Sequence, residues 1–409
     1  MTHSPSSLHL FEAFGVELEY MMVEADSLNV CPKVDKLFES IAGHSTSLVQ
    51  GDKVDMDNEL AAHVVELKNP VPTSSLMGLA VAFQKQIKDL EGPLGKMGCR
   101  LLPTAMHPWM DPHKELKLWP LGDHTIYNKL HEIFDCRGHG WANLQSTHLN
   151  LPFTGDEEFH LLHSAIRPVL ALVPTLAASS PYADGKFCGV LDKRLLTYRD
   201  NSKKVFSVTG HVIPEVCTSQ KNYHKDILEK MWADLAPYDP EGVLRYEWMN
   251  ARGAIARFDR MAIEIRLVDI QETPWMDLAL VSVIISVIQN LVQSKRAYDA
   301  DKWNCQTLKL ILERGIHEGE QAQLSPEFME LFGLRSRQPL PAYEFWQAMT
   351  QEGLCHAKGF EKYWQVYLSE GTLASRMLRR LGAQPAKSDL YNLFDELGYC
   401  LTGGEPFMA

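Results

Sequence analysis

The sequence predicts an α+β protein in which strands come first and a mostly helical part follows. Segments that alternate between apolar and polar residues, as half-buried strands do, are spread over the first two thirds of the chain. After residue 301 the apolar residues recur at helical spacing instead, as at Leu308, Ile311 and Leu312. The sequence shows no internal repeat and no low-complexity linker. We therefore expect one domain over residues 1–300 and a helical portion over residues 301–409 that packs on it.

Strands are expected where short apolar or alternating runs end at turn-forming residues. Gly15 opens the first run, and the Asn-Pro-Val-Pro stretch at residues 69–72 closes the second. Residues 52–60 are acidic and are expected to form a loop, as are residues 107–120, which contain several prolines. The expected strands cover residues 16–23, 61–67, 100–106, 142–151 and 261–268.

Long helices are expected between and after these strands. Each should begin at a residue whose side chain can accept a hydrogen bond from the first turn, and proline is suited to the first helical position. The helices are expected to run to about residues 90, 172 and 292, after caps at Ser74 or Ser75, at Asp156 and at Thr273.

The composition argues against several classes of partner. The 409 residues carry a formal net charge of −12, which argues against nucleic acid or an anionic membrane as the main partner. The most apolar segment, residues 278–292, is shorter than the roughly 20 residues that span a bilayer, so we expect a buried helix there. The 8 cysteines are scattered without a C-x-x-C pair, and the N-terminus has no secretory pattern. Free thiols and a cytoplasmic location are therefore expected.

Charged and coordinating residues alternate with apolar residues in several expected strands. Residues two positions apart on a strand share a face. Carboxylates are ligands that Mg²⁺ and Mn²⁺ prefer, a neutral imidazole can complete a shell, and arginine supplies fixed positive charge for phosphate. Such a set suits phosphoryl transfer, in which positioning and charge neutralisation dominate. The pairs that share a face are Glu17 and Glu19, His148 and Asn150, and Glu264 and Arg266.

Each of these patterns alone has an ordinary structural interpretation. The Glu-x-Glu pair is more often a solvated strand face, the histidine a hydrogen-bonded structural residue, and the Glu-x-Arg pair part of a cross-strand ion pair. A similar Glu-Gly-Glu at residues 318–320 is interpreted as a solvated helix end or loop. The joint occurrence of the patterns, in this order along the chain, favours the functional interpretation.

The order of these residues resembles the glutamate–cysteine ligase family of the glutamine synthetase-like superfamily. The shared pattern is Glu-x-Glu on an early strand, two further glutamates, a histidine on a middle strand and Glu-x-Arg on a late strand. The stretches Phe-Gly-Val-Glu-Leu-Glu at residues 14–19 and Ser-Ser-Pro-Tyr-Ala-Asp-Gly at residues 179–185 also resemble the family, and the resemblance spans about residues 11–275. In this chain the pattern falls on Glu17, Glu19, Glu59, Glu66, His148, Glu264 and Arg266.

The resemblance implies a curved antiparallel sheet that forms a funnel-shaped active site with helices outside, within a catalytic domain over residues 1–300. ATP would enter one end of the funnel and the amino acid the other, with Mg²⁺ or Mn²⁺ between them. Arg266 would stabilise the γ-phosphate during transfer. One cation would be held by Glu19, Glu59 and Glu66, and a second, nearer the transferred phosphate, by Glu17, His148 and Glu264.

Three further residues are candidates for binding substrate or phosphate. Many family members have His-x-His where this chain has His148-Leu149-Asn150, and the Asn150 amide can offer hydrogen bonds instead. Arg194 follows the loop at residues 179–185, and Arg257 belongs to a cluster with Arg252 and Arg260 before the last strand. A role as ordinary surface arginines is equally open for this cluster.

The resemblance implies an ATP-dependent carboxylate–amine ligase. It would phosphorylate a carboxylate, such as the γ-carboxylate of glutamate, and an amine such as cysteine would then displace phosphate from the acyl phosphate. Alternatives are a guanidine or amine kinase on the same scaffold and a non-catalytic nucleotide- or metal-binding relative. A metallohydrolase is disfavoured, because the sequence has no H-E-x-x-H pattern. The expected partners are small molecules rather than nucleic acid or a membrane, and a homo-oligomer is left open.

Overall fold

An antiparallel sheet of 8 strands forms the centre of the protein. The computed structural model describes residues 8–122 and 124–409. The strand path is open rather than closed into a barrel. The predicted α+β class with an antiparallel sheet is confirmed. The order is β2 (Leu48–Val49), β3 (Asp55–Asn58), β4 (Val64–Lys68), β1 (Gly15–Glu24), β6 (Ser146–Pro152), β10 (Ala262–Asp269) and β9 (Ala254–Arg257), and β5 (Cys99–Leu102) pairs with β1 off this path.

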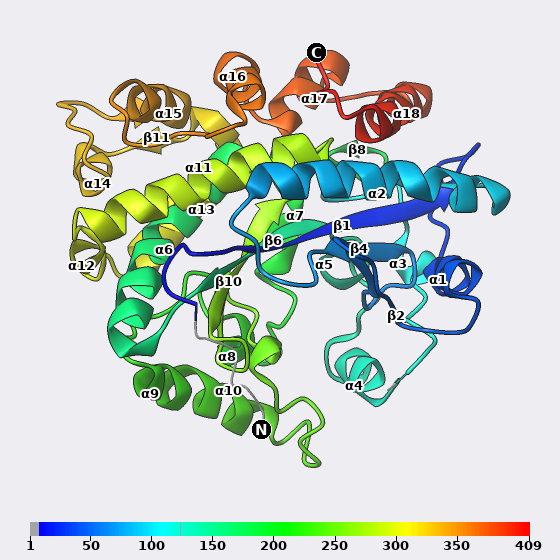
Figure 1. Ribbon diagram of the computed structural model, residues 1–409, viewed down its shortest axis with the longest axis horizontal. Coiled ribbons are helices and arrows are strands. Elements are labelled where there is room, and N and C mark those ends of the chain that lie inside the picture. Colours follow the sequence, from blue (N-terminus) through cyan, green and yellow to red (C-terminus); the bar gives the residue numbers. More distant parts are fainter. Residues whose placement is uncertain (1–7, 123) are drawn as a thin grey trace.

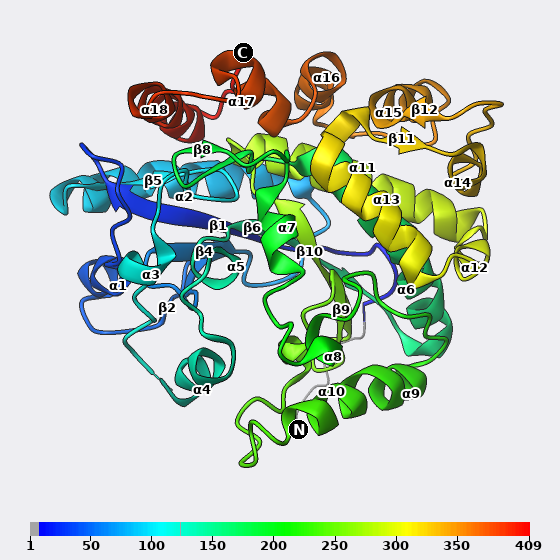
Figure 2. The same ribbon diagram turned by 180° about the vertical axis from the view of Figure 1, so that it is seen from behind.

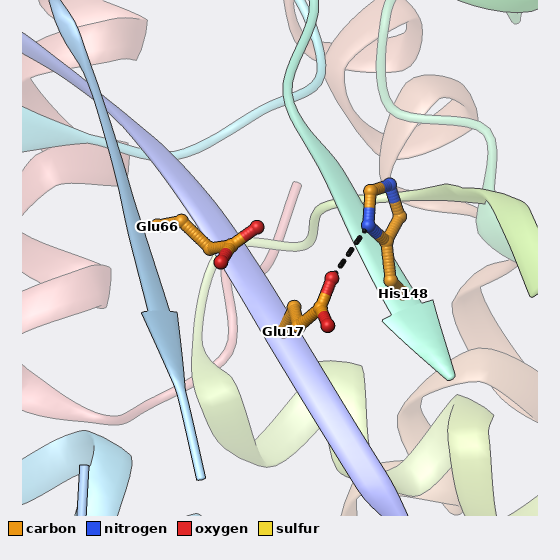
Figure 3. Close-up of side chains that lie close together, drawn as sticks. All are labelled: Glu17, Glu66 and His148. Carbon is orange, nitrogen blue, oxygen red and sulfur yellow. Dashed lines mark hydrogen bonds and ion pairs between the residues drawn. The ribbon is translucent and has the colours of Figure 1, made fainter. Parts of the chain in front are cut away.

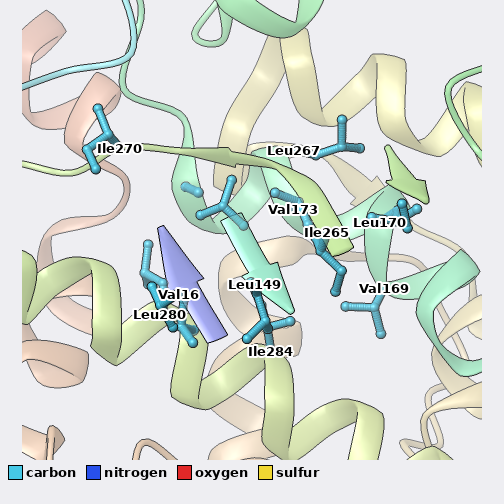
Figure 4. Close-up of a cluster of buried hydrophobic side chains, with 14 of the residues drawn as sticks. Val16, Leu149, Val169, Leu170, Val173, Ile265, Leu267, Ile270, Leu280 and Ile284 are labelled. Atoms are coloured by element: carbon cyan, nitrogen blue, oxygen red, sulfur yellow. The ribbon is translucent and has the colours of Figure 1, made fainter. Parts of the chain in front are cut away.

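One face of the sheet packs on two long helices and forms the core. Val16 of β1, Leu149 of β6 and Ile265 of β10 are each 0% exposed. They lie in one apolar cluster with residues of α6 (Gly155–Ala177) and α11 (Pro274–Gln293), as Figure 4 shows. Because side chains alternate along a strand, burying these residues turns their charged neighbours to the opposite face.

The helices lie in layers on the apolar side of the sheet. Figures 1 and 2 show α2 (Leu76–Lys96) and α11 next to the sheet and the C-terminal helices beyond them. The core cluster includes residues from both parts of the chain, among them Val16, Leu308, Phe345 and Leu401. The predicted boundary near residue 300 stays a prediction. The helices after α11 include α12 (Ala297–Ala300), α13 (Cys305–Glu318), α14 (Pro326–Leu331), α15 (Ala342–Gln351), α16 (Glu361–Glu370), α17 (Leu373–Leu381) and α18 (Lys387–Gly403).

Short elements complete the fold, and some of them lie on the other side of the sheet. In both views α4 (His124–Phe134) and α10 (Lys230–Leu235) are on the side away from α11 (Figures 1 and 2). The others are α1 (Val34–Ala42), α3 (Pro112–Glu115), α5 (His139–Ala142), α7 (Lys193–Tyr198), α8 (Phe206–Thr209), α9 (Gln220–Tyr223), the π-helix η1 (His224–Glu229), the 3₁₀ turns η2 (Glu247–Met249) and η3 (Gly319–Gln321), and the strand pairs β7 (Tyr182–Ala183) with β8 (Lys186–Phe187) and β11 (Gln323–Leu324) with β12 (Leu340–Pro341).

Within residues 8–122 and 124–409, two helices have the length and apolar composition of membrane spans. They are α6 and α11, and 89% and 78% of their most apolar windows are buried inside the protein. Neighbouring helices and the sheet therefore cover their apolar surfaces. The expectation of a buried helix at residues 278–292 is confirmed.

Two of the predicted helix caps are confirmed and one is wrong. The Ser75 side chain accepts a hydrogen bond from the Gly78 N–H at the start of α2, and the Thr273 side chain accepts one from the Met276 N–H at the start of α11. The α6 helix instead follows Thr154. The Asp156 carboxylate lies in the first turn of α6 and accepts the Gln220 N–H at 2.9 Å, so it is engaged by another segment.

The expected strand limits needed correction near the site. Residues 52–60, expected to form a loop, contain β3, and Asp57 of β3 pairs with Glu66 of β4. Residues 142–145 precede β6, which begins at Ser146. The sequence did not predict β9, which carries Arg257 beside β10. Short edge strands have little periodicity of their own, because their neighbours supply the pairing.

Candidate active site

A cavity of about 680 Å³ lies over the polar face of the sheet. The central strands β4, β1, β6 and β10 contribute many of its charged side chains. Nearly all of the candidate residues from the sequence line this one cavity: Glu17, Glu19, Glu59, Glu66, His148, Arg194, Arg257, Glu264 and Arg266.

Strand register explains why residues far apart in the sequence meet here. His148 of β6 is directly opposite Glu17 of β1, and Glu66 of β4 is opposite Glu19 of β1. Opposed residues of antiparallel strands point to the same face. β10 pairs with β6, so Glu264 joins this face from the other side of His148. Strand pairing thus brings these side chains onto one face of the sheet.

His148 and Glu17 form the central ion pair. The Glu17 Oε2 atom accepts a hydrogen bond from His148 Nδ1 at 2.9 Å, drawn in Figure 3. Burial alone would raise the pKa of Glu17, but the hydrogen bond and charge of His148 outweigh it and lower that pKa to about 2. Burial would likewise lower the pKa of His148, yet the same hydrogen bond and the charge of Glu19 raise it to about 9. The imidazole is therefore held between carboxylates.

Ser146 fixes the other side of the imidazole. His148 Nε2 lies 2.9 Å from Ser146 Oγ, and Ser146 donates from both its Oγ and its backbone N–H to Glu19 Oε2. These hydrogen bonds orient the His148 ring and the Glu19 carboxylate at the same time. Such support is typical of groups that must keep a fixed geometry at a site.

Three carboxylates crowd together beside this pair. One oxygen each of Glu19, Glu59 and Glu66 lies within 4.8 Å of the others. Burial first, and then the charge of Glu19, raise the pKa of Glu59 to about 8. Burial and the charges of Glu17 and Glu59 raise the pKa of Glu66 well above its ordinary value. The cluster thus resists full ionisation unless positive charge is present.

The donor set of this cluster fits hard divalent cations. A second group, Glu17, Glu66 and His148, also offers ligand atoms within 4.8 Å of one another, and Glu66 belongs to both groups. Oxygen-rich donors of high negative charge are what Mg²⁺ and Mn²⁺ prefer, and a cation would relieve the repulsion among the carboxylates. The first predicted ligand set, Glu19, Glu59 and Glu66, matches one of these groups residue for residue.

Glu264 lies among arginines and belongs to neither of these two sets of ligands. Its Oε1 atom accepts from Arg266 Nε at 2.5 Å, and its Oε2 atom accepts from Arg257 Nη1 at 3.3 Å. The Glu264 carboxylate is 3.9 Å from His148, so it remains next to the Glu17–His148 pair. The β6–β10 register shifts between Ile265 and Val268, and this irregularity includes Arg266. Such bulges re-aim side chains near active sites.

The remaining candidates differ in how freely they face the cavity. Asn150 Nδ2 donates to Glu17 Oε1 at 3.3 Å, and its Oδ1 is buried without a partner in the described part of the chain. Arg194 is 1% exposed and donates its Nε–H to Asp269 at 2.5 Å. Arg194 therefore braces β10 through Asp269 while it lines the cavity, and its predicted substrate role stays a prediction.

The other two arginines of the predicted cluster separate in space. Arg252 does not line the cavity; its buried side chain forms an ion pair with the partly exposed Glu215, with contacts of 2.6 and 2.8 Å. Arg260 lines the cavity with a side chain that is 49% exposed and lies 3.7 Å from Glu17. Of the cluster, Arg260 is the arginine whose charge is least engaged.

Sequence reasoning missed several residues of the site. Lys68 contacts both Asp57 and Glu66. Burial alone would lower the pKa of Lys68, but the two carboxylates outweigh it and raise that pKa. Lys68 stands two positions after Glu66 on one strand, so the period of two could have identified it. Tyr127 of α4 and Trp141 of α5 also line the cavity, and the sequence analysis did not predict these two helices.

The Glu-Gly-Glu sequence at residues 318–320 does not line the cavity. Glu318 is exposed at the end of α13, as expected, whereas Glu320 is 5% exposed and accepts a hydrogen bond from Thr372 Oγ1 at 2.9 Å. The interpretation as a solvated end is right for Glu318 and wrong for Glu320. The packing of α17 against this turn buries the second carboxylate.

Comparison with known proteins identifies the family. The chain is 29% identical over 394 residues to an uncharacterized protein of Archaeoglobus fulgidus, a match that covers 96% of this chain and 100% of that protein. It is 24% identical over 218 residues to a "Putative glutamate–cysteine ligase 2" of Bradyrhizobium sp., covering 52% of this chain and 48% of that protein.

A solved structure and a family model extend this comparison. The glutamate–cysteine ligase of Francisella tularensis, solved in complex with AMP, resembles this chain in fold with a TM-score of 0.60 at 12% identity, over 97% of this chain and 90% of that one. The model of glutamate-cysteine ligase family 2 (GCS2) matches residues 13–317, which is most of the chain. The chain belongs to glutamate-cysteine ligase family 2.

Proposed function

We propose that the protein is an ATP-dependent carboxylate–amine ligase. The observation that carries the proposal is a single cavity in which two groups of cation ligands share Glu66 and lie beside the Arg266–Glu264 pair. Transfer of a phosphoryl group to a carboxylate brings anions together, so it needs this density of positive charge and of sites for cations. Membership of a family named for a ligase supports the same reaction class.

The residues that would hold Mg²⁺ or Mn²⁺ are the two sets of ligands described above, Glu19, Glu59 and Glu66, and Glu17, Glu66 and His148. When bound there, such a cation would neutralise phosphate charge and help to align the reacting oxygens. The chain itself contributes fixed geometry: Ser146 orients His148 and Glu19 through hydrogen bonds. Arg266 contributes a planar fork of donors that suits the oxygens of a transferring phosphoryl group.

We assign the triphosphate of ATP to the arginine end of the cavity. Arg257, Arg260 and Arg266 all line that end, from β9, β10 and the turn between them. Trp248 lines it too and offers a flat aromatic surface, stacked on Tyr246 at 5.2 Å between ring centroids. A nucleoside triphosphate would thus find charge for its phosphates and an aromatic surface for its base.

The proposed reaction has two steps. A carboxylate oxygen of the acid substrate attacks the γ-phosphorus of ATP, the bond to the bridging oxygen breaks, and ADP leaves. The resulting acyl phosphate then reacts with an amine to give an amide and phosphate. Glutamate, through its γ-carboxylate, is the acid that we propose, and both substrates are small molecules.

Trapping with hydroxylamine tests this proposal. The protein would be incubated with ATP, Mg²⁺, glutamate and hydroxylamine, and the γ-glutamyl hydroxamate would be measured together with released phosphate. We expect equal amounts of both, because hydroxylamine needs no amine pocket to react with an acyl phosphate. Phosphate release that is independent of any carboxylate would contradict the proposal.

The same assay separates the alternatives. A guanidine or amine kinase would transfer the phosphoryl group to the nitrogen compound and would form no hydroxamate. A non-catalytic relative would bind the nucleotide without turnover. Repeating the assay with aspartate and other dicarboxylates in place of glutamate would then define the acid substrate.

A further inference from the structure

The two ends of the cavity differ in chemistry. One end carries arginines from β9 and β10, as described above. The other end is formed by α4, α5 and the segments next to them. Its lining side chains, here called the apolar wall, are Leu121, Ile126, Tyr127, Leu130, Trp141 and Leu144.

The apolar wall is a built surface that belongs to the folded structure. Leu130 is 4% exposed, and Ile126 and Tyr127 pack against the main core cluster. Trp141 stacks on Phe134 at 5.6 Å between centroids and donates its Nε1–H to the Asn201 carbonyl oxygen at 3.3 Å. The wall therefore holds its shape through contacts with three separate segments.

The apolar wall lies next to the carboxylate cluster. Asn58 Nδ2 donates to the Tyr127 hydroxyl oxygen at 3.0 Å, and Asn58 directly precedes Glu59. The charge of Glu59 also contributes, after burial, to a raised pKa of Tyr127. A molecule bound to the apolar wall would thus lie beside Glu59 and Glu66, where the acyl phosphate is proposed to form.

The apolar wall lacks positive charge. Among the described residues of segments 58–64 and 119–144, no lysine, arginine or histidine lines the cavity. Lys68, which lines the cavity from β4, already contacts Asp57 and Glu66. A ligand carboxylate placed on this wall would lose its hydration without gaining a partner, and it would face the acidic cluster.

We propose that the apolar wall binds the amine substrate, and that this amine has an apolar or aromatic body and no carboxylate. The proposal rests on the proposed function, which assigns the arginine end to ATP. It differs from the expectation of an amino acid such as cysteine as the amine. In the step concerned, the amine nitrogen bonds to the acyl carbon and the bond from that carbon to phosphate oxygen breaks. The electron pair leaves with phosphate, and the nitrogen loses a proton to solvent.

Matched pairs of amines with and without a carboxylate test the proposal. The pairs are 2-phenylethylamine with phenylalanine, 3-methylbutylamine with leucine, and cysteamine with cysteine. Each would be added to the protein with ATP, Mg²⁺ and the acid that forms hydroxamate, and the amide would be measured by mass. We expect kcat/KM for the first two carboxylate-free amines to exceed that of their partners by at least about tenfold, because the site would reject an unpaired carboxylate.

A variant of the apolar wall supplies the second readout. Ile126→Lys places a cation on the wall and should shift the preference towards the carboxylated partner of each pair, with little change in the KM for ATP. Leu144→Asn, a milder change, should raise the KM for the apolar amines at least severalfold if the lysine variant fails to fold. Leu310→Lys is the matched control, because Leu310 is 53% exposed on α13.

The outcomes distinguish this proposal from the proposed function. If no hydroxamate forms with any acid, the ligase assignment itself fails. If hydroxamate forms but the amino acids are preferred, or none of these amines reacts, the apolar-amine proposal is wrong. A wall variant that raises the KM for ATP and leaves the KM for the amine unchanged would assign the wall to the nucleobase and overturn the proposal.

Discussion

Arg266 donates its Nε–H to Glu264 at 2.5 Å, although the two residues lie on the same strand. Arg266 lies within the register shift between Ile265 and Val268. Glu264 is buried and Arg266 half-buried, since the Glu264 side chain is 2% exposed and that of Arg266 19%. Arg266 Nη1 also donates to the Trp248 carbonyl oxygen at 3.4 Å. A guanidinium has five N–H donors, so others remain for an anion, as phosphoryl transfer requires.

Replacing Arg266 should affect catalysis more than folding. We expect Arg266→Ala to keep most ATP affinity and to lower kcat by roughly two to three orders of magnitude, the cost of losing one electrostatic donor to the transition state. Arg266→Lys should recover only part, because a point charge cannot replace the fork. Turnover and melting temperature would be measured on the same preparations. Arg379→Ala, at a surface ion pair with Glu370, is the control. A destabilised but fully active Arg266→Ala would show that the residue is structural.

Removal of divalent cations should abolish nucleotide binding. The cavity carries clustered carboxylates, so a triphosphate entering without cations meets like charge. We expect binding of a non-hydrolysable ATP analogue, followed by calorimetry, to disappear in excess EDTA and to return when Mg²⁺ is restored. EDTA already saturated with Mg²⁺ is the control. Equal affinity with and without EDTA would contradict the cation assignment.

Substitution of Glu66 should weaken cation binding more than substitution of any other ligand, because Glu66 belongs to both sets of ligands. Glu66→Gln keeps the shape of the side chain and removes its charge. We expect the Kd for Mn²⁺, measured by electron paramagnetic resonance, to rise at least about tenfold, as happens when even the supporting groups of metal sites are lost. Glu318→Gln, at an exposed position, should leave it unchanged. Unaltered Mn²⁺ binding by Glu66→Gln would remove Glu66 from the ligand set.

Arg194 offers a test between bracing and substrate binding. Its side chain is 2% exposed and that of Asp269 0%. Removing one partner of a buried pair leaves the other charge unpaired, so Arg194→Met should lower the free energy of unfolding by about 3–5 kcal/mol in a urea titration. The double variant Arg194→Met with Asp269→Asn should recover part of that loss. A stable Arg194→Met with a raised substrate KM would instead support the binding role.

His163 should make the protein less stable in acid. The residue is 1% exposed, it packs on Phe159 and Tyr223, and neither ring nitrogen has a hydrogen-bond partner in the described part of the chain. Burial lowers the pKa of His163 to about 3, with further contributions from Arg167, His160 and Arg252. As the pH falls below about 6.5, the unfolded chain binds a proton that the folded protein excludes, so stability decreases.

The variant His163→Phe removes this dependence and fits the aromatic surroundings. Between pH 7 and pH 5 it should gain about 2 kcal/mol of unfolding free energy relative to the unaltered protein. Urea titrations at both pH values would measure this difference. The same substitution at exposed His44 should show no such gain. A pH-independent difference for His163→Phe would mean that the ring is charged or hydrogen-bonded in the folded state.

The strand faces of the site were predictable because they depend on local geometry. Glu17 and Glu19, two positions apart, share a face wherever that segment is a strand. The apolar residues between them specify which face is buried, as the full burial of Val16 and Leu18 shows. Local pattern could not predict β9, because an edge strand of four residues takes its conformation from its partner β10.

The sequence by itself determined which side chains face the cavity along each strand and which donor types they bring, since both follow from residue identity and a period of two. Only the tertiary structure decided that Glu66 is shared by two sets of cation ligands and that Glu264 pairs with arginines. It also decided that α4 lines the end of the cavity away from the arginines with an apolar wall. These features depend on strand register, on the irregularity in β10 and on the docking of a helix. Each is set by contacts between segments far apart in the chain, whose energies no local pattern contains.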